Sequence, residues 1–569
     1  MKKGQILEGT VIYMDFPNKG MVETEEGQVI VKNALPGQRV RLQINKKRSG
    51  RYEGRLLEIL DEGPDACDSE CCGNADVCGG CLYRKRRYET TLEIKKEQIH
   101  KLLDGAIGEN LYEFEGILPS PSVTHYRNKM EYSFGDAYKD GPLALGFHKR
   151  NSTYDIVNTD GCRLASEAME LIRKATLDFF SDKGIPFYHK MTHIGYLRHL
   201  LVRHTAAYNE IMVALVTSDQ TDLLSNAGYE EQDLMRQYCD CIRNCIPADS
   251  LGKIMGILHM TNSSVADVVR SEQTDILYGN AEIKEKLFDL EFQITPFSFF
   301  QTNSKGAEVL YGKVREYVTE SFKVEGDGTT IFDLYSGTGT IAQVIAPVAD
   351  HVIGVEIVEE AVAAAALNAE KNGLGDKCSF IAGDVLKTID EIAEKPDYII
   401  LDPPREGIHP KALPKILEYG VDHIVYISCK PTSLAEDLQT FFAYGYRVEK
   451  VCAVDMFPWA GHVETCCLLV RENAHDDEMV SIKVDLEGIS LNQGKFVPDE
   501  KPTYGNIKKW VKENYGFNVT SLYIGQIKDK AGIKERQNYN IGSGEGRVPN
   551  CPPEKEEAIM AAFRHFGLV

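Results

Sequence analysis

Short runs in which apolar and polar residues alternate fill the first sixty residues. Two of them are GQILEGTVIYM at 4–14 and QRVRLQIN at 38–45. Alternation with a period of two is typical of a β-strand with one buried face. Glycine and proline separate the runs at 17–20 and 36–37. The pattern predicts a small β-barrel over residues 1–62.

The pattern changes further along the chain. Over residues 291–472 a strand, a glycine turn and a helix recur, which predicts a Rossmann-like, parallel α/β sheet. Residues 63–290 mix strands and helices, with helical periodicity over 88–104, and predict an α+β domain. Residues 480–569 read as a small extension of unknown role, with helices at 504–515 and 554–566. The predicted fold class is multidomain α/β.

Charge changes this picture locally. The net charge of the 569 residues is −21, yet residues 1–60 hold 11 Lys/Arg against 7 Asp/Glu, and residues 84–87 read RKRR. These basic residues could form an anion-binding face despite the acidic net charge of the chain. Alternatively, they could be the solvated side chains of a charged edge strand. No apolar run approaches twenty residues and the N-terminus lacks a signal-peptide pattern, so we expect a cytoplasmic protein without a membrane partner.

A nucleotide site is predicted where the strand at 331–334 runs into a glycine turn. Gly337 and Gly339 allow the backbone to approach a ligand closely. Glu356 ends the next strand, where a carboxylate can accept both ribose hydroxyls. A dinucleotide and S-adenosylmethionine both fit, and the GTGT turn favours S-adenosylmethionine. Asp384 ends a third strand and suits an adenine amino group, or it caps a helix.

The segment DPPREG follows another apolar strand and places Asp402 at the ligand-binding edge of the sheet. Methyltransferases that act on amino groups carry an aromatic residue after the two prolines, to stack the base. Arg405 stands there in this chain, which points away from amino-group chemistry.

A thiol ends the strand HIVYIS, which should lie beside the strand that leads to Asp402. Ser433 and Glu436 fit a capping box, so a helix should begin just after Pro431. A helix N-terminus and Lys430 would both lower the pKa of Cys429 and favour its thiolate. The alternative is a small core residue.

A thiolate beside a methyl donor suits methylation of a pyrimidine at carbon 5. Its addition to carbon 6 makes carbon 5 nucleophilic, and a base must then remove the carbon-5 proton. Glu464 is our candidate for the base, and His462 is either an alternative base or a residue that orients it.

Three cysteines, Cys72, Cys78 and Cys81, lie too close together to be unrelated in a reduced protein. Zinc and an iron–sulfur cluster both fit, and the spacing does not choose between them because a later fourth ligand is needed in either case.

The segments DPPREG, YISCKPTSLAEDL and DMFPWAGHVET resemble those of the bacterial RNA uracil-C5-methyltransferases, which make 5-methyluridine in 23S rRNA and tRNA. The resemblance extends to about residue 472. It implies a class I S-adenosylmethionine-dependent methyltransferase domain with Cys429 as nucleophile and Glu464 as proton acceptor. The cofactor contacts that it implies are Gln301, Tyr335, Glu356 and Asp402.

The same resemblance extends to the other domains. The barrel is similar to the family's RNA-binding TRAM domain, and residues 126–131 and 197–199 match segments of its RNA-binding central domain. Many members bind a 4Fe-4S cluster, and the match implies Cys72, Cys78, Cys81 and Cys162 as its ligands, with zinc as the alternative. We expect a monomer whose partner is RNA, with rRNA as the first candidate and tRNA as the second. A catalytically silent iron–sulfur RNA-binding protein is the competing hypothesis, and the chemistry alone also fits a cytosine-C5 enzyme.

Overall fold

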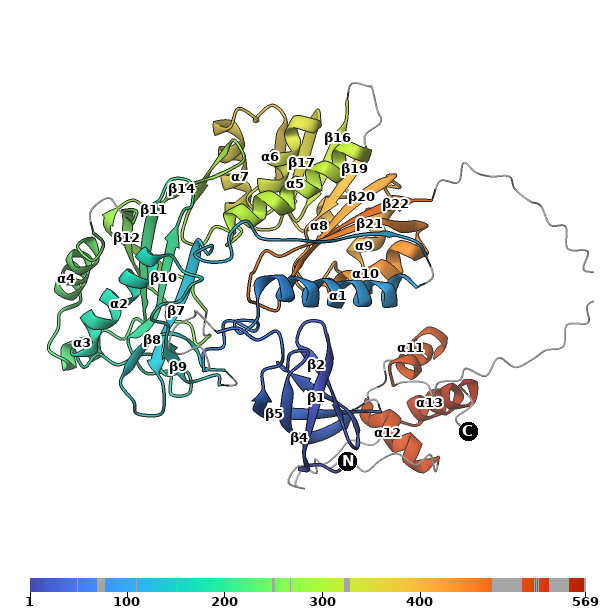
Figure 1. Ribbon diagram of the computed structural model, residues 1–569. Coiled ribbons are helices and arrows are strands. Elements are labelled where there is room, and N and C mark those ends of the chain that lie inside the picture. Colours follow the sequence, from blue (N-terminus) through green and yellow to red (C-terminus); the bar gives the residue numbers. More distant parts are fainter. Residues whose placement is uncertain are drawn as a thin grey trace, which may run out of the picture. The chain divides into compact units, whose positions relative to one another are not determined.

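The computed structural model divides the chain into two compact units, Met1–Asp476 and Asp477–Val569. The residues that it describes are 1–48, 50–68, 77–108, 110–150, 152–247, 251–266, 268–321, 328–472, 504–515, 517, 519, 521–531 and 552–566. Figure 1 shows the described helices and strands along the chain.

The N-terminal strands close into a five-stranded barrel, as the alternating pattern predicts, in the order β1-β2-β3-β5-β4. Their bounds are β1 (Ile6–Asp15), β2 (Lys19–Thr24), β3 (Gly27–Lys32), β4 (Arg39–Arg48) and β5 (Arg51–Asp61). The inward positions of the alternating runs form the barrel core, which includes Val11, Val22, Val29, Val40 and Leu42. Their polar neighbours face solvent, so the barrel follows directly from the period of two.

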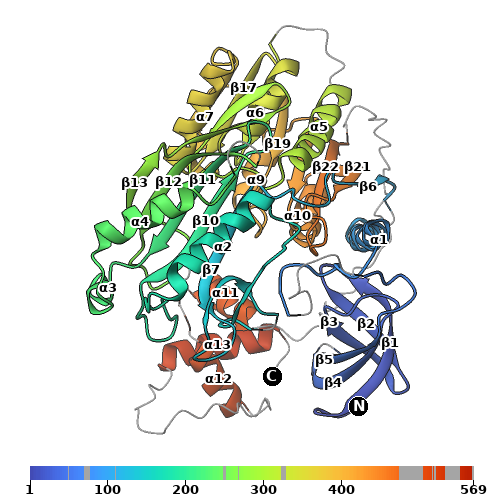
Figure 2. The same cartoon turned by 60° about the vertical axis from the view of Figure 1, so that its left-hand side comes forward.

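The second sheet has seven strands in the order β13-β12-β11-β10-β7-β8-β9. These strands are β7 (Lys129–Asp136), β8 (Leu143–His148), β9 (Ile156–Asn158), β10 (Leu197–His204), β11 (Glu210–Thr217), β12 (Lys253–Thr261) and β13 (Gln273–Gly279). Helices α2 (Glu167–Ser181) and α4 (Glu231–Arg243) contact this sheet and each other, and both lie across it in Figure 2.

The third sheet has eight strands in the order β18-β17-β16-β19-β20-β22-β21-β6. Its strands are β16 (Thr330–Leu334), β17 (His351–Glu356), β18 (Cys378–Ala382), β19 (Tyr398–Leu401), β20 (His423–Ser428), β21 (Tyr446–Val454), β22 (Glu464–Arg471) and β6 (Glu113–Leu118). The neighbours β19 and β20 run parallel, as expected, but β22 runs antiparallel to both β20 and β21.

Strand β6 comes from the region that the sequence pattern assigns to the central α+β domain. It pairs in parallel with β21 at the edge of the third sheet. Helix α1 (Tyr88–Ile107) covers the predicted helix 88–104 and packs against α10 (Pro431–Ala443), as Figure 1 shows. Residues of α1 share one hydrophobic core with one face of the third sheet. Residues of α5 (Ser304–Ser321) belong to a second core, which contains residues from the other face of that sheet. An early segment of the chain thus completes the domain that holds the site.

The second unit contains the helices α11 (Tyr504–Tyr515), α12 (Ser521–Lys530) and α13 (Pro553–His565). The first and third match the helices expected from the sequence. Apolar residues such as Ile507, Ile524 and Phe563 form its core. Within the described residues, no helix combines the length and the apolar character that crossing a bilayer requires.

Candidate active site

The glycine turn after β16 has the backbone conformation that its sequence predicts. Gly337 and Gly339 have φ values of 55° and 70°, and the non-glycine Tyr335 also lies in the left-handed region at 70°. A Cβ atom on Gly339 would lie 2.6 Å from the ring of Phe380, so glycine is required there by space as well as by conformation. Tyr335 is a sterically costly choice at its position, which marks the turn as a constrained part of the site.

Glu356 ends β17 beside this turn. Its carboxylate accepts hydrogen bonds from the amide of Gly337 at 3.1 Å and from the amide of Val358 at 2.9 Å. Asp384 is exposed and accepts a hydrogen bond from the amide of Leu386 at 3.0 Å, as the N-cap of α8 (Val385–Thr388). Asp384 therefore caps a helix, which is the alternative that the sequence analysis left open. A contact between Asp384 and adenine stays a prediction.

Two acids, the buried Asp333 and the half-buried Asp402, form the floor of the site at the carboxyl ends of β16 and β19. Burial raises the pKa of Asp402 to about 7. Burial, and then the neighbouring Asp402, raises the pKa of Asp333 to about 8. One oxygen of Asp333 accepts a hydrogen bond from the amide of Ala342 at 3.0 Å, and the other is buried without a partner in the described residues. Such an arrangement favours a cation at this edge of the sheet.

Tyr311 is a site residue that the sequence analysis missed. It lies on α5, and its side chain interacts with Gln301 and lies close enough to Asp402 and Glu464 for both to raise its pKa, although burial is the largest cause. Gln301 therefore contacts a tyrosine that senses both acids, and its contact with S-adenosylmethionine stays a prediction. No motif surrounds Tyr311 in the sequence, because it is brought to the site only by the packing of a helix.

The nucleophile and base candidates come together across an antiparallel pair. Ser428 of β20 pairs with Thr465 of β22, so the next residues in the two strands, Cys429 and Glu464, lie opposite each other. Cys429 is half-buried, whereas Glu464 is only 3% exposed. Burial, and then Asp402, raises the pKa of Glu464 to about 8, while Arg405 lowers it. A carboxyl with such a pKa can exchange protons near neutral pH.

The expected lowering of the Cys429 pKa is wrong for the free protein. Burial, followed by the nearby Glu464 and Asp402, raises the pKa of the thiol to about 11. The cation that lowers this pKa is Arg405, through its charge and through a hydrogen bond to the thiol, whereas Lys430 is not among the groups that shift it. The sequence analysis expected both acids near the thiol, but it weighed only the helix N-terminus and Lys430 and not the burial of the thiol or the charge of these acids.

Helix α10 begins at Pro431, as predicted, but not through a capping box. The side chain of its N-cap residue, Lys430, makes no capping hydrogen bond, and the hydroxyl of Ser433 instead donates to the carbonyl of Arg405 at 2.8 Å. Asp437 on the same helix accepts hydrogen bonds from the amide of Ile408 at 3.0 Å and from the hydroxyl of Tyr426 at 2.6 Å. The helix that follows the nucleophile therefore also holds the loop that carries Arg405.

The cysteines expected to bind a cluster are only partly described, because Cys72 lies outside the described residues. Burial, together with the neighbouring Cys162 and Cys78, raises the pKa of the Cys81 thiol to about 12. Across the described ranges, no three His, Cys, Asp or Glu side chains are arranged to hold a metal ion.

Comparison with known proteins identifies the family. The sequence model of the tRNA (Uracil-5-)-methyltransferase family matches residues 252–472. An uncharacterized RNA methyltransferase of Clostridium acetobutylicum is 44% identical over 472 residues, which cover 83% of this chain and 99% of the relative. A second, from Clostridium tetani, is 42% identical with the same coverage. The chain belongs to the RNA uracil-C5-methyltransferase family.

A solved structure supports the fold of this family member. The tRNA (uracil-54, C5)-methyltransferase of Pyrococcus abyssi, in complex with S-adenosyl-L-homocysteine, matches with a TM-score of 0.60 and 24% identity. The match covers 81% of this chain and all of that structure. At this level of identity the likeness establishes the shared architecture, and the roles of single residues rest on the geometry described above.

Proposed function

We propose that this methyltransferase transfers a methyl group from S-adenosylmethionine to carbon 5 of a uridine in RNA, with 23S rRNA as the first candidate and tRNA as the second. The observation that carries the proposal is the pairing of β20 with β22, which sets Cys429 opposite Glu464 beside Asp402. Both groups that the reaction needs are present, which argues against a catalytically silent RNA-binding protein.

The chemistry follows from these two side chains. The Cys429 thiolate forms a bond to carbon 6, and the electrons of the carbon 5–carbon 6 double bond move into an enolate. Carbon 5 then attacks the methyl group of the sulfonium, whose carbon–sulfur bond breaks to release S-adenosylhomocysteine. Glu464 takes the proton from carbon 5, the double bond re-forms and the thiolate leaves. One proton is released per methyl group transferred.

The cofactor is assigned to the glycine turn and the neighbouring strand ends. We assign cofactor contacts to Gln301, Tyr335 and Asp402, and we assign the ribose to Glu356, whose carboxylate accepts a hydrogen bond from the amide of Gly337. Asp384 lies close enough to Tyr335 to influence its pKa, which keeps it a candidate for the adenine end. The positive sulfonium would be stabilised by the acids of the floor.

RNA binding is supported by a groove between the barrel and the residues that follow the cysteines. Eight basic and three acidic side chains line it. The basic ones include Lys32, Lys46, Arg48, Arg55, Arg84 and Lys85, and the acidic ones are Glu53, Glu58 and Glu62. Such a surface suits a phosphate backbone, and the barrel would act as a TRAM domain. The uridine must leave its stack to reach Cys429.

The 4Fe-4S cluster fits the described thiols in part. Cys78 and Cys162 both lie close enough to the half-buried Cys81 to raise the pKa of its thiol, although the three described thiols are not arranged to hold a metal ion as they stand. A cluster held by them and by Cys72 would join the segment before α1 to the central sheet. We assign it a structural role, and no step of the reaction uses it.

Mapping 5-methyluridine in rRNA and tRNA from cells with and without the gene tests the proposed function. One or two positions should lose their methyl group without the gene, and the gene for the Cys429→Ala protein should not restore it. The Cys429→Ala protein should still bind S-adenosylhomocysteine, because the thiol is not part of that site. Identical maps in all RNAs would refute the proposal.

A further inference from the structure

The segment 455–459, which links β21 to the base, is held by an unusual series of hydrogen bonds. Four successive carbonyl oxygens accept from groups elsewhere in the chain. Asn303 Nδ2 donates to Met456 O at 3.0 Å, Lys95 Nζ to Phe457 O at 3.1 Å, Tyr126 Oη to Pro458 O at 3.0 Å, and the amides of Leu82 and Tyr83 to Trp459 O at 2.8 and 3.0 Å. We call residues 455–459 the anchor segment. It ends five residues before Glu464.

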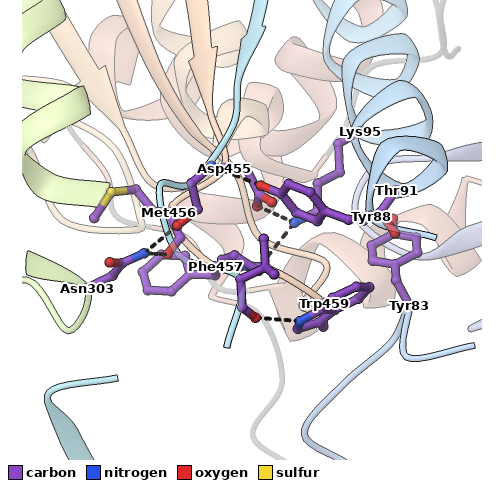
Figure 3. Close-up of polar contacts among 12 residues, drawn as sticks. Tyr83, Tyr88, Thr91, Lys95, Asn303, Asp455, Met456, Phe457 and Trp459 are labelled. Carbon is purple, nitrogen blue, oxygen red and sulfur yellow. Dashed lines mark hydrogen bonds and ion pairs between the residues drawn. The ribbon is translucent and has the colours of Figure 1, made fainter. Parts of the chain in front are cut away.

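A buried ion pair completes the anchor. Lys95 Nζ of α1 lies 2.6 Å from Asp455 Oδ1, both side chains are fully buried, and the two residues are 360 positions apart in the sequence. Figure 3 shows the lysine reaching both this carboxylate and the carbonyl of Phe457. Trp459 extends the network: its indole Nε1 donates to the carbonyl of Val123 at 2.7 Å, and its ring packs against Tyr88 with ring centroids 5.7 Å apart.

The energetics of such a pair point to a role in geometry. Removing two charges from water is costly, so a buried ion pair seldom adds much net stability, although breaking it by removing one partner is strongly destabilising. Its directional hydrogen bonds nevertheless fix the relative positions of the elements that they join. Here they join α1 to the segment that leads to the base. The backbone of residues 82–83, next to Cys81, holds the same segment.

We propose that Lys95 is a positioning residue, which acts through Asp455 and the carbonyl of Phe457 to hold the anchor segment so that Glu464 stays opposite Cys429. This inference rests on the proposed function. Cys429 is carried by β20 and α10, whereas Glu464 is carried by the anchored segment and β22. Loosening the anchor should therefore impair removal of the carbon-5 proton more than addition of the thiol.

The test compares Lys95→Met with Lys96→Met in the full-length protein. Met replaces each lysine with an uncharged side chain of similar length. Lys96 is on the same helix but exposed, with an ion pair to Glu93 only one helical turn away. The substrate is total RNA from cells that lack the gene, labelled with tritium at uracil carbon 5. Tritium released to water measures proton removal, and RNA bound to protein on a denaturing gel measures the covalent adduct.

We expect Lys95→Met to release tritium about 100-fold more slowly, since a displacement of 1 Å at a reacting group can cost that much. The adduct should accumulate, and S-adenosylhomocysteine should bind as in the wild type. Lys96→Met should behave as the wild type. Should Lys95→Met fail to fold in a thermal unfolding assay, Tyr126→Phe removes only the hydrogen bond to Pro458 and should give the same accumulation of adduct to a smaller extent.

Three outcomes separate the inference from the proposed function. The positioning role would be overturned if a folded Lys95→Met protein released tritium at the wild-type rate and accumulated no adduct. If Lys95→Met does not fold, the same result in Tyr126→Phe would overturn it. Equal slowing of adduct formation and of tritium release would overturn it too, because a general structural effect would then suffice. A wild-type protein that forms neither adduct nor 5-methyluridine would refute the proposed function itself.

Discussion

Arg405 should control the reactivity of Cys429, and the Arg405→Gln substitution tests this. The arginine is the group that lowers the pKa of the thiol, partly through a hydrogen bond, against the opposing effects of burial, Glu464 and Asp402. A hydrogen bond to a charged group contributes about 1.5–3 kcal/mol. Because Arg405 is exposed to solvent, screening places its effect at the lower end, which corresponds to about tenfold less thiolate at a given pH.

The assay is the rate of adduct formation with rRNA in which uridines are replaced by 5-fluorouridine. Fluorine cannot leave carbon 5 as a cation, so the methylated adduct accumulates and is counted on a denaturing gel. Arg405→Gln should form it about tenfold more slowly at pH 8, and the difference should shrink as the pH approaches the pKa of the thiol. RNA affinity is measured separately, since an exposed arginine can also contact phosphate.

The matched control is Lys430→Gln, next to the nucleophile in the sequence. Lys430 is exposed and is not among the groups that shift the pKa of Cys429, so this protein should react at the wild-type rate. The opposite result, a slow Lys430→Gln and an unaffected Arg405→Gln, would refute the reasoning from the structure and restore the expectation from the sequence.

Three further predictions concern the buried acids. Tritium release from the preformed adduct should become faster with pH up to about 8, the pKa of Glu464, and Glu464→Gln should instead accumulate the RNA adduct at every pH. In chemical denaturation, the contribution of Asp333, Asp402 and Glu464 to the free energy of unfolding should fall as the pH rises from about 4 to about 8. The raised pKa values of Asp333, Asp402 and Glu464 make the folded state bind more protons than the unfolded state in that range, so the Asp402→Asn protein should lose less stability. In calorimetry, the affinity for S-adenosylmethionine should increase with pH more than the affinity for S-adenosylhomocysteine, which lacks the sulfonium charge, because ionised Asp402 favours that charge. An equal pH dependence of the two affinities would contradict this assignment.

Local patterns were sufficient for much of the fold. The period of two predicted the barrel, and helical periodicity predicted α1, α11 and α13, because each pattern reflects which residues of one element are buried. The adjacency of β19 and β20 followed from the rule that parallel strands end at one edge of a sheet. The pairing of Cys429 with Glu464 was predicted from chemistry, since a pyrimidine-C5 reaction needs both a nucleophile and a base.

Features that depend on contacts between distant segments could not be predicted from the sequence. Nothing in residues 113–118 indicates that they add a strand beside β21, and no pattern links Lys95 to Asp455. The direction of the Cys429 pKa shift was missed for the same reason. This shift depends on the burial of the thiol and on acids carried at the ends of β19 and β22. Lys430 lies next to the thiol in the sequence but is not among the groups that shift its pKa.

The antiparallel β22 explains why the base needs an anchor. In a parallel sheet only the carboxyl ends of strands reach the ligand-binding edge, so Asp402 and Cys429 are each held by the strand that precedes them. A strand of opposite direction brings its first residue to that edge, and Glu464 stands at the start of β22. Because no strand of the sheet runs directly into Glu464, the chain on its N-terminal side must be fixed by other contacts. The buried Lys95–Asp455 pair and the four bound carbonyls supply that support. The geometry of catalysis therefore depends on helix α1, which lies more than 300 residues earlier in the chain.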